Sequence, residues 1–245
     1  IVLVIIPSLF KFGWMRSTKR YISIISALTE LGYEVHTIAQ RYESELTQIE
    51  LEREFSDSLI LKRIGPSVKF LKLLRFPFKN TFKGYFQYFT SVLWGKLTPI
   101  NGVLTRSEVE RVEFIWAMSG QLIESAILAR RLSNKFDIPW VYELHDPPIG
   151  ADILCTNRLI QEEHKKLLKD SDFIVTNAHT YKEHLIKSYG ILECKISNIY
   201  LKISSFSNSS FERNTLNIGY FGSLSNPRNI DYFASAKFFE SLSDE

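Results

Sequence analysis

Short apolar runs alternate with amphipathic segments along most of this 245-residue chain. Residues 1–6 form an uninterrupted apolar run, which is typical of a strand buried on both faces of a parallel sheet. Residues 17–31 predict a helix that begins at the N-cap Ser17 and ends at Gly32. Its predicted apolar stripe consists of Tyr21, Ile24, Ile25 and Leu28. Residues 34–39 predict a second strand, so the chain opens with a βαβ unit.

The same alternation continues through the middle of the chain. Further strands are predicted at residues 59–64, 113–117, 140–144, 172–176 and 196–200. Helices are predicted at residues 68–97 (one or two helices), 121–136, 157–168 and 180–189. In the predicted helix at residues 121–136, the inward positions are Leu122, Ala126, Ala129 and Leu132. Strands alternating with helices predict an α/β fold with a Rossmann-like, doubly wound parallel sheet.

The composition changes after residue 203, where serine and asparagine dominate. Residues 204–215 therefore predict a linker that follows a first domain of residues 1–203. Residues 216–245 predict the first strand and helix of a second Rossmann-like domain. We expect the chain to be a fragment that ends inside this second domain.

Composition narrows the class of protein. The formal net charge of +3 is too small to imply nucleic-acid binding. Cys155 and Cys194 have no metal-ligand spacing, and we expect both to be reduced in a cytoplasmic protein. The sequence has no apolar run long enough to span a membrane, and its first residues lack the features of a signal peptide.

The strongest chemical candidates follow the predicted strand at residues 140–144. His145 and Asp146 come directly after it, and Glu143 lies inside it. Because ligands bind at the carboxyl edge of an open parallel sheet, this position favours a functional site. His145 has the chemistry to accept a proton or hold a sugar hydroxyl, and Asp146 to orient it or bind a hydroxyl. The alternative is a loop histidine beside an aspartate that caps a turn.

Two glycine loops are candidates for binding a phosphate. Gly13 and Arg16 lie between the first strand and the first helix, where the helix N-terminus favours an anion. The single glycine does not make the Gly-x-Gly-x-x-Gly fingerprint of a dinucleotide enzyme. Gly222 follows the first strand of the predicted second domain, and Arg228 has the forked donors that suit a diphosphate. Turn glycines and a surface arginine are the alternative.

Residues 62–96 are basic and rich in aromatic side chains. No acidic residue lies between Asp57 and Glu108. A segment of this kind suits an anionic membrane surface, and it equally suits solvated helices whose aromatic side chains fill the core. Nucleic acid is not expected, because no nucleic-acid motif accompanies the charge.

The other histidines do not predict a metal site. His179 and His184 are five residues apart, which places them on different sides of a helix. His36 lies in a predicted strand, and His164 follows two glutamates on a predicted solvated helix face. We therefore expect no metal centre.

Five stretches together resemble glycosyltransferases of the GT-B architecture, which have two facing Rossmann-like domains, and are most similar to the retaining family four. The matching stretches are residues 28–35, 138–146, 170–176, 189–199 and 218–225. Each stretch is a loose motif, and their order and spacing carry the resemblance, which spans nearly the whole chain.

The resemblance implies a nucleotide-sugar donor, an acceptor bound mainly by the first domain, and neither cofactor nor metal. It implies that Gly13 and Gly222 lie near the donor diphosphate and that Arg228 neutralises it. It places His145 against the transferred sugar or the acceptor, which is expected to be a glycan or a lipid-linked sugar of a cell-surface polysaccharide.

Three features depart from the family pattern. Ser223 stands where many relatives have arginine, and Asn229 stands where many have lysine. The paired glutamates of the family would fall beyond Glu245, so we expect this fragment to be inactive alone. A non-catalytic binding module of the same fold is the main alternative, and a non-hydrolysing sugar epimerase of similar architecture is another.

Overall fold

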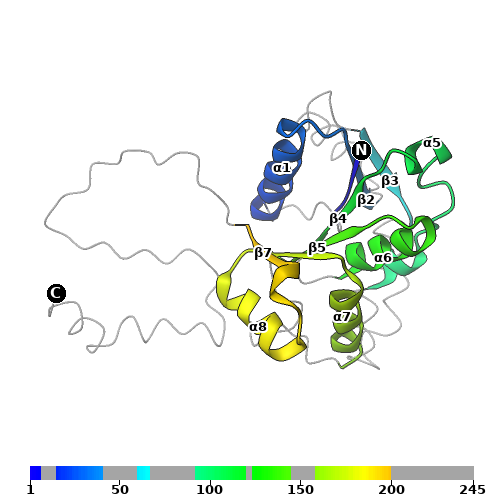
Figure 1. Ribbon diagram of the computed structural model, residues 1–245. Helices are drawn as coiled ribbons and strands as arrows, with labels where there is room; N and C mark the ends of the chain where they lie inside the picture. The colour runs from blue at the N-terminus through cyan, green and yellow to red at the C-terminus, as the bar shows by residue number, and fades with distance from the viewer. Residues whose placement is uncertain (7–14, 41–59, 67–91, 120–122, 145–157, 200–245) are drawn as a thin grey trace, which may run out of the picture.

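The computed structural model describes residues 1–6, 15–40, 60–66, 92–119, 123–144 and 158–199 (Figure 1). Its centre is a sheet of seven parallel strands in the order β3-β2-β1-β4-β5-β6-β7. The strands are β1 (Val2–Ile5), β2 (Val35–Gln40), β3 (Ile60–Ile64), β4 (Phe114–Ser119), β5 (Trp140–Leu144), β6 (Phe173–Thr176) and β7 (Ile196–Asn198). The predicted α/β, Rossmann-like parallel sheet is confirmed.

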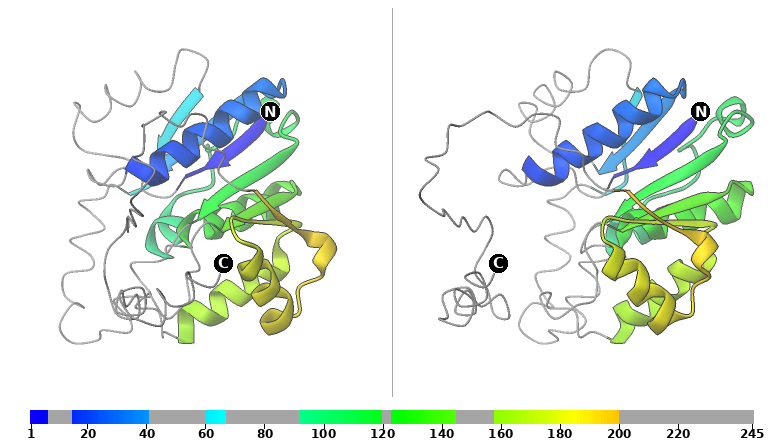
Figure 2. Two further views of the ribbon diagram at one scale, coloured as in Figure 1. Left: turned by 90° about the vertical axis from the view of Figure 1, so that its left-hand side faces the viewer. Right: turned by 60° about the vertical axis from the view of Figure 1, so that its left-hand side comes forward.

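Helices cover both faces of this sheet. The helices are α1 (Met15–Glu30), α5 (Arg106–Val109), α6 (Glu124–Phe136), α7 (Arg158–Asp170) and α8 (His179–Tyr189), with a 3-10 helix at Glu193–Lys195. Residues 92–97 are also helical. Figure 2 shows α1 on one side of the sheet and α6 and α7 on the other, which gives three layers.

The uninterrupted apolar run of β1 serves two separate cores. Val2, Val4 and Ile6 pack in the cluster that contains the apolar stripe of α1. Leu3 and Ile5 pack in the larger cluster that contains α6, α7 and α8. Since successive side chains of a strand point to opposite faces, a strand covered on both faces must be apolar at every position.

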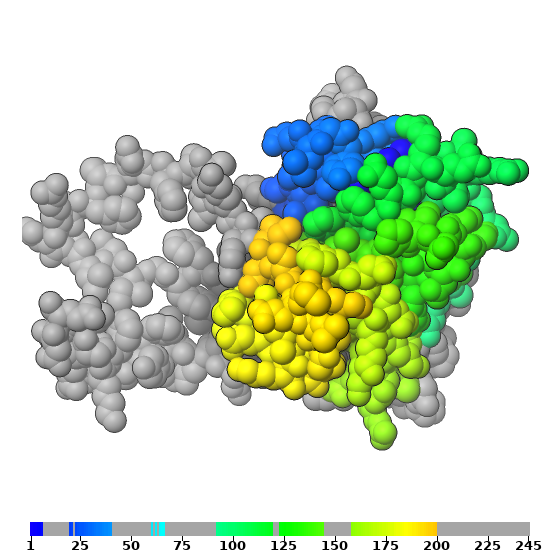
Figure 3. Space-filling model, viewed as in Figure 1, coloured from blue at the N-terminus to red at the C-terminus, as the bar shows by residue number. Residues whose placement is uncertain are grey.

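The predicted apolar stripe of α1 is buried, and the end of β7 reaches the same core. Tyr21, Ile24, Ile25 and Leu28 are all at most 8% exposed. Ile199 packs against this cluster, and the space-filling view shows α1 and the β7 region on one face of the molecule (Figure 3). The α1 layer therefore connects the first strand with the last strand of the sheet.

The predicted ends of α1 and α8 are confirmed at their C-termini, whereas α7 ends two residues later than predicted and α1 and α6 begin at other residues than predicted. Gly32, just past α1, and Gly190, the C-cap of α8, have the positive φ angles of 89° and 65° that glycine adopts without strain. The prediction that Ser17 caps α1 is wrong, because the helix begins two residues earlier at Met15. The prediction also missed α5, although Thr105 and Glu108 form the capping box that starts it.

His164 lies in the core, so its predicted place on a solvated helix face is wrong. The residue is 1% exposed, and its Nδ1 is 3.1 Å from the Tyr142 hydroxyl. The rings of Tyr142 and Tyr189 flank it edge-on. Burial, with the charge of His184 as a smaller contribution, lowers the pKa of His164 to about 3. It therefore packs as a neutral aromatic residue at neutral pH.

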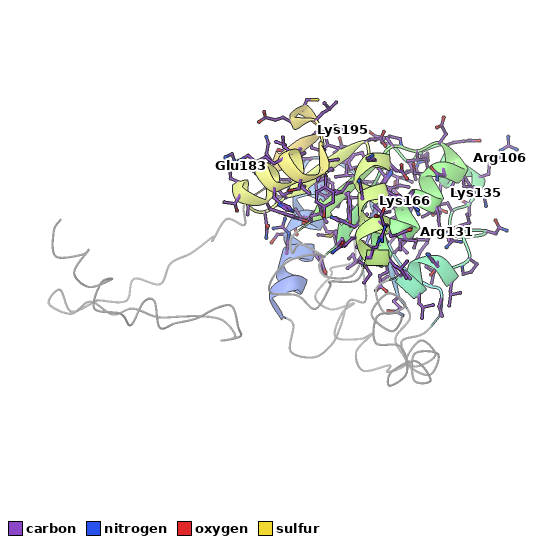
Figure 4. All side chains as sticks on the ribbon, turned by 90° about the horizontal axis from the view of Figure 1, so that it is seen from below. Arg106, Arg131, Lys135, Lys166, Glu183 and Lys195 are labelled. Carbon is purple, nitrogen blue, oxygen red and sulfur yellow. The ribbon has the colours of Figure 1, made fainter. Side chains whose placement is uncertain are left out.

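Two cations of α6 bind the segment at residues 92–101. Arg131 Nη1 donates to the carbonyl oxygens of Gly95 and Thr98, and Lys135 Nζ donates to Asn101 Oδ1. Figure 4 shows Arg131 and Lys135 side by side on this flank, seen from below. The guanidinium thus supplies donors to carbonyl groups in the last turn of the helical residues 92–97 and just after it.

The described ends of the basic, aromatic segment are packed into the fold. Trp94 is fully buried, and its Nε1 donates to the carbonyl oxygen of Ile64. Lys62 pairs with Glu108. Residues 67–91 lie outside the described residues, as do the predicted linker and the second domain at residues 200–245.

Candidate functional site

The carboxyl edge of the sheet is the part of the fold that suits a ligand. All seven strands are parallel, so their carboxyl ends share one edge. β1 is paired with β2 on one side and with β4 on the other. The chain therefore reverses its direction of winding between β1 and β4, and such switch points open a crevice at the carboxyl edge.

Glu143 is a fully buried carboxylate near this edge. It is the fourth residue of β5 and pairs in register with Met118 of β4, which packs in the α1 core. Its Oε1 atom accepts a hydrogen bond from Arg20 Nε at 2.5 Å, and its Oε2 atom accepts one from Trp116 Nε1 at 2.5 Å. We call these three residues, Arg20, Trp116 and Glu143, the Glu143 cluster.

Three elements build the Glu143 cluster. Arg20 lies one helical turn before Ile24 of the apolar stripe, so α1 directs it toward the sheet. Trp116 and Phe114 alternate with buried residues on the same face of β4, and their rings are 6.4 Å apart. The cluster therefore ties α1 to the middle of β4 and to the fourth of the five residues of β5.

The ion pair in this cluster is dry. Arg20 and Glu143 are 2% and 0% exposed. A buried carboxylate is retained only when its charge is paired and its oxygens are hydrogen bonded, and Glu143 meets both conditions. Arg20 meets them in part, because its Nη1 and Nη2 atoms are buried without a hydrogen-bond partner among the described residues.

A second group of polar side chains lies at the carboxyl ends of β4 and β6. Ser125 Oγ donates to the carbonyl oxygen of Met118 at 2.6 Å, and Thr176 Oγ1 bonds to Asn198 Oδ1. Glu124, in the first turn of α6, is 1% exposed. One of these polar pairs thus joins α6 to β4, and the other joins β6 to β7.

Most of the predicted site residues lie outside the described part of the chain. This holds for His145, Asp146, Gly13, Gly222 and Arg228. Arg16 lies in the first turn of α1, and only its backbone is described. His145 and Asp146 directly follow β5, so the predicted strand that leads to them is confirmed. Their roles stay a prediction.

The sequence prediction missed Arg20 and Trp116. The signal for Arg20 was its spacing, since it lies four residues before Ile24 on the apolar face of α1. The signal for Trp116 was weaker, because strand alternation does not reveal which residue of the neighbouring strand faces Glu143. A buried glutamate in an apolar strand nevertheless demands a cation, and only one arginine lies on the apolar face of α1 in the described residues.

The described ranges contain no group of three metal-ligating side chains. None of their helices is both long and apolar enough to cross a membrane. Cys194 is an exposed free thiol, and Cys155 is outside these ranges.

No protein-family model and no curated protein matches this sequence. Among solved structures, the fold is similar to apo UGT2 from Phytolacca americana, with 10% identity and a TM-score of 0.50 over 85% of this chain and 53% of that chain. It is also similar to HepE from Anabaena in complex with UDP and glucose, with 14% identity and a TM-score of 0.48 over 81% of this chain and 44% of that chain.

A glycosyltransferase from Rickettsia africae is a third similar structure. Its identity is 17% and its TM-score is 0.42, with 81% of this chain and 42% of that chain covered. The chain spans about half the length of the solved structures it matches. At these identities the likeness concerns the fold.

Proposed function

We propose that this chain forms the acceptor-side domain of a retaining, family-four-like glycosyltransferase. The enzyme moves a sugar from a nucleotide-sugar donor to a glycan or lipid-linked acceptor in the synthesis of a cell-surface polysaccharide. Two features support this proposal: the Rossmann-like sheet and the order of family-like motifs along the sequence.

One observation carries the proposal. The Glu143 cluster fixes the carboxyl end of β5, and His145 and Asp146 follow Glu143 within three residues. Burying an ion pair costs desolvation free energy. A buried ion pair just before a histidine and a carboxylate, at the edge of the sheet where ligands bind, therefore favours a functional role for the loop that carries them. Such support is what a site needs to hold a sugar in a reactive orientation.

The proposed roles follow the chemistry of each residue. His145 holds the transferred sugar or the acceptor hydroxyl, and Asp146 orients His145 or binds a hydroxyl. Gly13 and Gly222 allow the backbone to approach the donor diphosphate, and Arg16 and Arg228 stabilise the negative charge that develops as it leaves.

We also propose a peripheral site at the cytoplasmic face of the membrane through the basic, aromatic segment at residues 62–96. Changing Lys69, Lys72, Arg75 and Lys79 to glutamine in the full-length gene product should abolish sedimentation with anionic liposomes, because basic side chains near an anionic surface each contribute about 1 kcal/mol. Unchanged sedimentation would contradict the proposed binding of this segment to a membrane surface.

The central test is a transfer assay. The full-length gene product is incubated with a panel of nucleotide sugars and glycan or polyprenyl-diphosphate acceptors, and release of nucleoside diphosphate is measured. We expect the His145→Ala variant to lose at least about tenfold in kcat/KM with the productive pair.

His179→Ala is the matched control, because the His179 side chain is 67% exposed on α8. This variant should keep wild-type turnover. Equal turnover in His145→Ala and wild type would remove His145 from the site. Nucleotide-sugar binding without transfer to any acceptor would favour a binding module that lacks chemistry.

A further inference from the structure

Only one of the three nitrogen atoms in the Arg20 guanidinium group has a hydrogen-bond partner in the described residues. Its Nε atom donates to Glu143 Oε1 at 2.5 Å. The terminal nitrogens Nη1 and Nη2 are buried and have no hydrogen-bond partner in the described part of the chain. Buried polar groups nearly always have a partner, so four N–H donors that share one side chain call for an acceptor.

Glu143 does not supply that acceptor, because its oxygens bond to Arg20 Nε and to Trp116 and to neither terminal nitrogen. A carboxylate beside an arginine commonly accepts two parallel hydrogen bonds from the guanidinium. Here Oε2 accepts from Trp116 Nε1 at 2.5 Å instead. The indole thus holds the carboxylate against Nε alone, which leaves both terminal nitrogens for another group.

The same fold satisfies its other partly buried arginines. Arg131 Nη1 donates to two carbonyl oxygens. Arg130 lies between α6 and α7, and its two terminal nitrogens donate to Glu163 and Asp170. Arg20 is more deeply buried than either, so its unpaired nitrogens are the exception among these three arginines.

The position of Arg20 indicates what the missing partner is. It lies in the second turn of α1, a helix of 16 residues whose N-terminus is at the carboxyl edge of the sheet. The exposed N–H groups of a helix N-terminus favour negative charge, and the forked donors of arginine match the paired oxygens of a carboxylate or phosphate. Both features select an oxyanion.

We propose that Nη1 and Nη2 of Arg20 bind the oxyanion of a substrate, which is either a phosphate of a nucleotide or the acidic group of a sugar acceptor. Glu143 and Trp116 are positioning residues, since Glu143 holds the guanidinium through Nε and Trp116 holds the carboxylate of Glu143. The choice of these two ligand classes rests on the proposed function, whereas the test below measures anion binding alone, so its failure and the failure of sugar transfer are separate results.

The test measures binding by isothermal titration calorimetry with two probes, inorganic pyrophosphate and glucuronate. The variant Arg20→Gln with Glu143→Gln removes both charges together, which avoids leaving one buried charge unpaired. We expect it to bind the productive probe at least about tenfold more weakly than the wild type. The matched control is Arg130→Gln with Glu163→Gln, which removes an ion pair between α6 and α7 and should leave binding unchanged.

Arg20→Lys provides a second comparison if the double variant does not fold. Lysine keeps the charge and lacks the fork, so it too should bind at least about tenfold more weakly. Binding of pyrophosphate alone would assign the site to a nucleotide, and binding of glucuronate alone to an acidic acceptor. Failure of the wild type to bind either probe, or equal binding by the wild type and Arg20→Lys, would overturn the proposal.

Discussion

The two edges of the sheet differ in how their charged side chains are paired. At the carboxyl edge, the ion pair of Arg20 and Glu143 is buried, and the terminal nitrogens of Arg20 have no partner in the described ranges. At the amino edge lies a second cluster, which we call the His36 cluster. Its members are Glu34, His36, Lys62, Glu108 and Arg111.

In the His36 cluster each carboxylate lies beside a cation or the imidazole of His36, and the outer pair of Glu34 and Arg111 is exposed to water. His36 Nε2 is 2.7 Å from Glu34 Oε1, and its Nδ1 is 3.3 Å from Glu108 Oε1. The Glu34 and Arg111 side chains are 42% and 59% exposed. The amino edge therefore joins β2, β3 and α5 with ion pairs, although His36 Nδ1 is buried without a hydrogen bond. At the carboxyl edge, two buried nitrogens of one cation have no partner among the described residues, at the place where a ligand is expected.

The largest effect should come from breaking the dry pair. Glu143→Leu leaves Arg20 buried without its carboxylate, and we expect a loss of about 3–5 kcal/mol in the free energy of unfolding, measured by urea denaturation. Adding Arg20→Met to this variant should recover most of the loss, because an apolar pair of similar volume is tolerated in a core. A loss below about 1 kcal/mol for Glu143→Leu would mean that the pair is solvated.

The second effect is a loss of stability in acid that comes from His164, which belongs to neither cluster. Its pKa is about 3 in the fold because of burial, against 6.5 as the ordinary value. Between these values the unfolded chain binds a proton that the folded chain does not, so stability should fall as pH falls from 6.5 toward 3. The slope should approach about 1.4 kcal/mol per pH unit, and above pH 6.5 this residue should not contribute to the pH dependence of stability.

Unfolding of His164→Gln as a function of pH checks this prediction. The variant should lose that slope, whereas His179→Gln should retain it because His179 is exposed. Equal slopes in His164→Gln and wild type would show that His164 is not the source. Removing this contribution also isolates the acid response of the His36 cluster.

The smallest effect should come from Glu108 in the His36 cluster. Desolvation by itself would raise the pKa of Glu108, but hydrogen bonds from Lys62 and Thr105 lower it to about 2. A lowered carboxylate pKa adds stability above pH 4.5, which is lost as pH falls toward 2. Glu108→Gln should therefore cost about 1 kcal/mol at neutral pH and flatten this part of the profile, measured by urea denaturation at several pH values.

Glutamine is also accepted in a capping box, so this substitution tests the charge of Glu108 apart from its capping of α5. Glu110→Gln is the control, since the Glu110 side chain is 66% exposed and its partner Arg106 is on the surface. An equal loss in the free energy of unfolding for both substitutions would show that Glu108 contributes no more than an ordinary surface charge.

Local patterns were enough to predict most elements of the fold. The spacing of apolar residues located β1, β5 and the inward face of α1, because burial on one or both faces determines which neighbouring positions are apolar. The N-terminus of α1 was misplaced because Ser17 is a good cap that the chain does not use. His164 was misplaced because two adjacent glutamates resemble a solvated face, while the rings of Tyr142 and Tyr189 that enclose it come from elsewhere in the chain.

The sequence by itself determined the alternation of strands and helices, the burial of the central strands and the presence of Glu143, His145 and Asp146 at the end of one strand. Only the tertiary structure decided which cation meets Glu143, because Arg20 is 123 residues away along the chain. It also decided that Trp116 donates to the second carboxylate oxygen and that the terminal nitrogens of Arg20 have no partner within the described part of the chain. Residue periodicity encodes which face is buried, whereas the pairing of buried charges depends on strand order and register, which arise when distant segments pack together.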